Sequence, residues 1–136
     1  MNQKLCFLFG HATISRDMVA QIKAVAQYHY LNHGIRTFVV GNRGDFDRHA
    51  AAAICSLKKH YPDITLLLLL AYHPSERAVT LSEGFDNSYY PPLGAVPKPF
   101  SIVRANRYMV KQADSIICYA THPGNARNLL DYARQL

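Results

Sequence analysis

Short apolar segments alternate along this chain with longer segments in which apolar residues recur every three or four positions. The nearly continuous apolar segments cover residues 4–9, 36–40, 64–72 and 115–120. A strand that is apolar on both faces usually lies centrally in a parallel sheet, covered by helices on either side. These four segments therefore predict the strands of a buried, parallel sheet.

The segments between the predicted strands have the period of amphipathic helices. We expect helices over about 15–33, 45–60 and 101–114, and a last one after residue 125. The positions expected to face the core are Met18, Ile22, Val25, Ala26 and His29 in the first helix, Phe46, Ala50, Ala53, Ile54 and Leu57 in the second, and Ala126, Leu129, Leu130 and Ala133 in the last.

Residues 73–100 interrupt this alternation. Five of the seven prolines lie in this segment, and its aromatic residues argue against disorder. We expect one short helix near residues 75–81 within it. A connection of this length in a compact domain is typical of a functional loop.

The order of the elements predicts an α/β fold with helices on both faces of the sheet. In such sheets, ligands bind beyond the carboxyl ends of the strands, where the winding direction reverses. A 3-2-1-4 order of the predicted strands puts this reversal between the first and last strands. Loops 10–13 and 121–125 would then meet there, with loop 41–47 beside them.

Each of these three loops combines a glycine with a predicted helix start. Free N–H groups at a helix start favour anions, and glycine lets a ligand approach the backbone closely. No loop contains a dinucleotide-binding fingerprint or a Walker motif. The glycines are Gly10, Gly41, Gly44 and Gly124.

Composition narrows the class of protein. A chain of 136 residues that is 49% apolar fits a single domain, residues 1–136, with a substantial core. The formal charge is +6, but Lys58-Lys59 is the longest basic run, which favours a small anionic ligand over a nucleic acid. The apolar run Leu66–Tyr72 is too short to cross a membrane. Three separated cysteines and no recognisable signal peptide predict a cytoplasmic protein with free thiols.

Two arginines and an asparagine stand near the start of the helix predicted over 101–114. Arginine offers phosphate or carboxylate a planar, permanently charged fork. We expect Arg104 and Arg107 to hold a phosphate or order the site, and Asn106 to bridge backbone groups. Two alternatives stay open: the arginines are solvated, or Asn106 and one arginine tie the helix to a neighbouring loop.

The best candidates for a catalytic carboxylate are Asp47 and Glu83, although nothing in their spacing selects either. Asp45 is expected to cap the helix that follows. His11, His73 and His122 each follow a predicted strand, but they lack recognisable metal-ligand spacing, so we predict no metal site. A hydrogen-bonding or stacking role is expected for His11.

Three motifs together resemble the SLOG superfamily. They are Phe9-Gly-His11, the loop Gly41-Asn-Arg-Gly-Asp-Phe-Asp47, and Arg104-Ala-Asn-Arg-Tyr-Met-Val110 followed by Ala113-Asp-Ser-Ile-Ile-Cys-Tyr119. The superfamily includes YpsA-like proteins, DprA and LOG-type nucleoside-monophosphate phosphoribohydrolases. The likeness covers nearly the whole chain and is closest to the short YpsA-like members.

The resemblance implies a Rossmann-like three-layer sandwich with a mostly parallel sheet of four or five strands. It further implies a nucleotide-derived ligand such as AMP, ADP-ribose or an NAD-like molecule, bound by a sensor or binding domain. The exposed edges and helices expected of such a fold favour a homodimer or other homo-oligomer. The expected ligand-binding residues are Gly10, His11, Gly41, Asn42, Arg43, Gly44, Arg104, Asn106, Arg107 and Gly124.

The pattern of the superfamily is not matched everywhere. Ala12 and Asn42 stand where arginine and glycine are usual. The LOG signature Pro-Gly-Gly-x-Gly-Thr-x-x-Glu is replaced by the segment Pro123–Asp131, which lacks the second and third glycines, the threonine and the glutamate. Whether the protein is an enzyme is therefore left open. The alternatives are a hydrolase of N-glycosidic bonds in nucleotides and a DprA-like module for single-stranded DNA.

Overall fold

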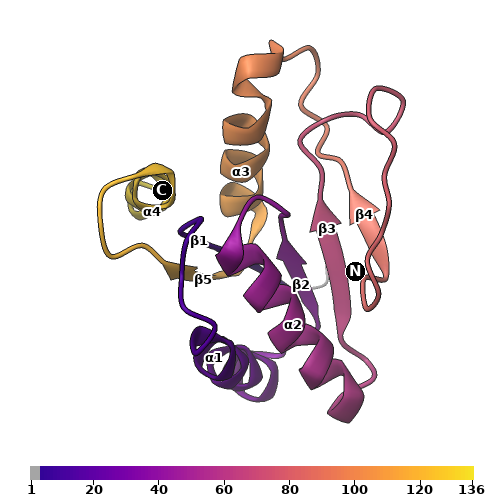
Figure 1. Cartoon of the computed structure of the whole chain (residues 1–136), viewed down its shortest axis with the longest axis vertical. Helices are drawn as coiled ribbons and strands as arrows, with labels where there is room; N and C mark the ends of the chain where they lie inside the picture. Colours follow the sequence, from indigo (N-terminus) through magenta and orange to yellow (C-terminus); the bar gives the residue numbers. More distant parts are fainter. Residues whose placement is uncertain (1–3) are drawn as a thin grey trace.

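The computed structural model describes residues 4–136 and contains a five-stranded sheet between two layers of helices (Figure 1). The strand order is β4-β3-β2-β1-β5, and every neighbouring pair is parallel. This is a Rossmann-like three-layer α/β sandwich, as predicted. The strands are β1 (Leu5–Gly10), β2 (Thr37–Val40), β3 (Thr65–Leu69), β4 (Asn87–Tyr89) and β5 (Ser115–Tyr119).

The helices cover both faces of the sheet because the central strands are apolar on both sides. Cys6 and Leu8 of β1 pack with α1 and α2, whereas Phe7 and Phe9 pack with α3 and α4. One core therefore lies on each side of the sheet. The helices are α1 (Met18–His33), α2 (Asp45–His60), α3 (Ser101–Gln112) and α4 (Asn125–Arg134), with the 3₁₀ turn η1 (Lys98–Phe100) before α3.

Most of the predicted helical faces are confirmed. All five positions predicted to face inward on α2 are buried. On α1, Ile22 and Ala26 are buried, but Val25 is 43% exposed, so its predicted place in the core was wrong. A helix of 16 residues packed along one side buries a narrow stripe, and Val25 lies beside that stripe.

The 3-2-1-4 order considered for the four predicted strands is found, as β3-β2-β1-β5, but the crossover was predicted incorrectly. No helix forms at residues 75–81. The N–H groups of Glu76 and Arg77 both donate to the carbonyl of His73, which closes a single turn. The chain then continues without regular structure, turns at Ser82–Phe85, and pairs with β3 as the edge strand β4, because Asp86 exchanges hydrogen bonds with Leu66 on β3.

Candidate functional site

A cavity of about 400 Å³ lies at the carboxyl ends of β1 and β2 and beside the loop that follows β5. Seven of the ten residues predicted to bind a ligand line it, together with the catalytic candidate Asp47. Loops that are more than 100 positions apart in the sequence thus meet at the predicted reversal of the sheet. The seven residues are Gly10, His11, Gly41, Arg43, Gly44, Asn106 and Gly124.

The three other predicted residues lie elsewhere. Asn42 is exposed and lines a second cavity, beside α2. Arg104 and Arg107 are exposed on α3 and line none of the cavities described here. The guanidinium of Arg107 lies over the ring of Tyr132 on α4, 4.6 Å from its centre. The phosphate-binding role of these two arginines remains a prediction.

The apolar positions of α3 explain why Asn106 reaches the cavity and the arginines do not. Ala105 and Met109 are buried against the sheet, and Asn106 lies next to this buried stripe. Arg104 and Arg107 are three positions apart and share the opposite, solvated side of the helix. The spacing of the apolar residues in the sequence carried this signal.

His11 connects the loop after β1 to the loop after β5. Its ring is buried, and Nε2 accepts hydrogen bonds from the backbone N–H groups of Thr121, at 2.8 Å, and His122, at 3.3 Å. An Nε2 atom that accepts must be unprotonated, so the ring is neutral and carries its hydrogen on Nδ1. Burial lowers the pKa of His11, and the neighbouring His122 lowers it further.

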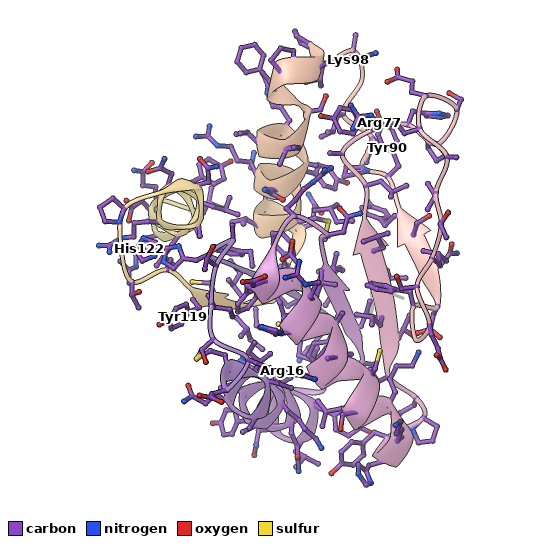
Figure 2. All side chains as sticks on the ribbon, viewed as in Figure 1. Arg16, Arg77, Tyr90, Lys98, Tyr119 and His122 are labelled. Atoms are coloured by element: carbon purple, nitrogen blue, oxygen red, sulfur yellow. The ribbon has the colours of Figure 1, made fainter. Side chains whose placement is uncertain are left out.

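His11 also stacks on His122, which lies in the loop between β5 and α4 (Figure 2). The ring centres are 3.6 Å apart and the planes differ by 6°. Tyr119 contacts the His11 ring edge-on from the end of β5. The hydrogen-bonding and stacking role expected for His11 is thus confirmed, and both interactions fix the position of the loop that leads into α4.

The start of α2 is occupied by the protein itself. The N–H of Asp45 donates to the carbonyl of Ala12 at 2.8 Å, and the N–H of Phe46 donates to that of His11. A Cβ on Gly44 would lie 2.6 Å from the Cα of Ala12, so glycine permits this close approach. These two N–H groups are therefore not available to a ligand.

Asp45 does not cap α2, contrary to the prediction. The N-cap position is Gly44, and the Asp45 carboxylate accepts a hydrogen bond from the N–H of Ile14 and pairs with Arg48. Asp47 makes the capping-type contact instead, because its Oδ2 accepts from the N–H of Arg43 at 2.8 Å. The carboxylate one turn into the helix reaches back to the loop more directly than the first helical residue does.

The start of α4, by contrast, opens into the cavity. Gly124, Asn125 and Ala126 line the cavity, and no side chain caps the helix. Gly124 has φ 152° and ψ −170°, a conformation that is essentially confined to glycine, and a Cβ there would meet nothing within 4 Å. The free N–H groups of a helix start attract anions, so this end of the cavity suits a phosphate or carboxylate.

The remaining polar groups give the cavity a mixed character. Among residues 4–136, Arg43 is the only lysine or arginine that lines the cavity. The guanidinium groups of Arg43 and Arg77 both lie over the ring of Tyr72. Arg77 occupies the same end of the sheet, beyond β3 (Figure 2). Burial raises the pKa of the Asp47 carboxyl, although the N–H and the charge of Arg43 oppose this shift. The inner wall is apolar and includes Phe7, Phe9, Leu69, Ile102 and Leu129.

The two catalytic candidates are not brought together in this cavity. Asp47 lines it, whereas Glu83 is exposed in the crossover and lines only the second cavity. Sequence reasoning also missed Asn125 and Ala126 as lining residues. The sequence feature that could have identified them is the segment His-Pro-Gly-Asn, in which no side chain is placed to cap the following helix.

No family model matches the chain, and no curated protein matches it. The resemblance to the SLOG superfamily therefore remains a prediction from three motifs.

None of the helices in the described part of the chain has the length and apolar character needed to cross a membrane. Within residues 4–136, no group of three or more His, Cys, Asp or Glu side chains is arranged to hold a metal ion.

Proposed function

We propose that this protein binds a nucleotide or a nucleotide-derived ligand in the cavity at the carboxyl ends of its strands, and acts as a sensor or binding domain. The observation that carries the proposal is the uncapped start of α4, which opens into a cavity lined by all three glycine loops. A phosphate group is the anion that such a helix start binds best.

The lining suits the other parts of a nucleotide as well. Arg43 supplies a positive charge near the anion, and the Oδ2 atom of Asp47 is already held by the Arg43 N–H. The second carboxylate oxygen of Asp47 accepts no hydrogen bond from the described residues, which makes it the acceptor for a sugar hydroxyl. The apolar inner wall suits a nucleobase.

A titration of two matched arginine variants tests this proposal. We expect AMP or ADP-ribose to bind, and Arg43→Ala to weaken that binding about tenfold to a hundredfold, since a hydrogen bond to a charged group contributes about 1.5–3 kcal/mol. Arg104→Ala is the control, because Arg104 is exposed and lies outside the cavity. Isothermal titration calorimetry measures both. Loss of binding in Arg104→Ala, with Arg43→Ala unaffected, would move the anion site to α3.

A hydrolase of N-glycosidic bonds is the second candidate function. It is favoured by Asp47, whose raised pKa in a cavity is typical of a general acid or base. Release of a free base from AMP that Asp47→Asn abolishes, while AMP still binds, would support this candidate. No base release by the wild-type protein would rule it out for AMP.

Binding of single-stranded DNA is the third candidate, and the shape of the site argues against it. The cations near the cavity are few, whereas binding to a strand requires an extended basic track and weakens strongly with salt. Salt-sensitive binding of a short oligonucleotide, with no binding of AMP, would replace the proposed function.

A cytoplasmic location and a homodimer also belong to the proposal. The cytoplasmic location is proposed because Cys6, Cys55 and Cys118 are free thiols.

A further inference from the structure

A second cavity, of about 840 Å³, runs along the side of α2 that faces away from α1. Its lining extends from Asn42, before the helix, to Lys59 near the helix end, and its opposite wall is the loop 82–85. On this face α2 packs against β3, and no helix of residues 4–136 covers β4 (Figure 1). Ligand pockets typically measure about 300–1,000 Å³, so this space is large enough for a substantial chemical group.

The wall formed by the loop is held firmly against α2. The Lys58 ammonium donates to the carbonyl of Gly84 at 2.9 Å and to the Asp86 carboxylate at 2.6 Å. Gly84 has φ 97°, and a Cβ there would lie 2.2 Å from the sulfur of Cys55. Glycine at this position therefore permits the loop to approach α2 closely, and the cavity has a built wall.

The second cavity adjoins the first. Gly41 and Asp47 line both, so the Asp47 side chain lies between the two spaces. A Cβ on Gly41 would lie 3.1 Å from the Oδ2 atom of Asp47, so the carboxylate packs against this backbone at the boundary of the two spaces. Asp47 thus separates two compartments of one site.

The chemistry of the second compartment differs from that of the first. Its floor is apolar and includes Ala51, Ala52 and Phe85, and Phe85 provides an aromatic surface. Three cations line it, but Arg48 pairs with Asp45 and Lys58 pairs with Asp86. The carboxylates Asp47 and Glu83 line it as well, so the lining carries no excess of positive charge. An apolar floor with an aromatic side chain suits a planar ring.

We propose that the groove beside α2 is the second compartment of the nucleotide site, and that it takes a ring-bearing extension of the nucleotide. This inference rests on the proposed function, since it assumes that a nucleotide occupies the first compartment. It specifies the ligand class as a dinucleotide rather than a nucleoside monophosphate.

Filling the second compartment alone tests this assignment. Ala52 is exposed, lines the second cavity and does not line the first, so Ala52→Trp adds bulk only there. The matched control is Ala24→Trp, at an exposed position of α1 that lines none of the described cavities. AMP and NAD, which share one nucleotide half, are titrated into the wild type and both variants by calorimetry, with circular dichroism as a check of folding.

We expect the wild type to bind NAD about tenfold more tightly than AMP, which corresponds to about 1.4 kcal/mol. Ala52→Trp should remove this difference without weakening AMP binding, and Ala24→Trp should change neither. Equal binding of AMP and NAD by the wild type, or NAD binding that Ala52→Trp leaves intact, would overturn the second compartment while nucleotide binding stands. Weakening of AMP and NAD alike in Ala52→Trp would also overturn it, because AMP would then occupy the groove. Binding of neither ligand by the wild type would refute the proposed function as well.

Discussion

At the scale of single residues, the site depends most on His11, which is buried where two loops meet. Its Nε2 atom accepts two backbone hydrogen bonds only while it is unprotonated. Protonation would turn this acceptor into a donor that faces two other donors, beside the stacked ring of His122. The position of the loop before α4 is therefore linked to the charge of one imidazole.

This linkage predicts a loss of stability in mild acid. The folded protein lowers the pKa of His11, so the unfolded chain binds the proton more readily. Stability is complete above the ordinary histidine pKa of about 6.5 and falls as the pH decreases below it. Urea denaturation at pH 7.5 and 5.5 measures this loss, and His11→Asn should reduce it.

The pKa of His29 is also lowered, first by burial and then by His33, so His29 contributes to the same trend. His29→Asn is therefore the comparison variant that isolates the share of His11. If His11→Asn leaves the difference between the two pH values unchanged, protonation of His11 does not control the loop.

Some of the site residues could be predicted individually and others could not. The glycine loops were predictable because the carboxyl ends of parallel strands meet at one edge of a sheet. The orientation of Arg104 and Arg107 depends on the rotation of α3, which is set by the burial of Ala105 and Met109. The Asp45 cap was predicted incorrectly because the backbone path brings the Asp45 carboxylate to the N–H of Ile14 and the Asp47 carboxylate to the N–H of Arg43.

At the scale of elements, the central strands and the helices follow from the apolar pattern, but the crossover does not. The strand β4 has only three residues, Asn87–Tyr89, and no apolar alternation. It exists because Asp86 is anchored on two sides, by the N–H of Leu66 and by Lys58. Such long-range contacts leave no periodic signal in the sequence.

Removal of the Lys58 anchor should loosen the crossover. The Lys58 side chain is 19% exposed, and its ammonium donates to Gly84 and Asp86, so Lys58→Met should destabilise the fold by about 1 kcal/mol or more and speed hydrogen exchange at residues 82–86. Lys59→Met is the matched control, since Lys59 is the exposed neighbour. Equal exchange in both variants would show that the Lys58 contacts do not hold the loop.

Acidification should affect the same anchor. Burial alone would raise the pKa of Asp86, but the bonds from Lys58 and the Leu66 N–H outweigh it, so the pKa lies below its ordinary value. The stabilisation is present above the ordinary pKa of the carboxyl and is lost as the pH falls through the lowered one. This range lies well below the one in which His11 titrates.

At the scale of the whole molecule, the fold class and the order of the central strands were predictable, and the location of the cavity followed from them. The ligand and the oligomeric state remain predictions, because neither depends on the pattern that specifies the fold. Val25, Tyr28 and Leu31 form an exposed apolar stripe on α1, which gives the expected homodimer one surface to use. Light scattering would establish whether it forms.

The most direct test of the account is a titration with AMP followed by two-dimensional ¹H–¹⁵N NMR of the backbone amides. We predict the largest shifts at the start of α4, residues 124–126, and in the loops at 10–12 and 41–44, with little change at Arg104 and Arg107. Shifts confined to the outer face of α3, or no shifts at all, would contradict a nucleotide site in this cavity.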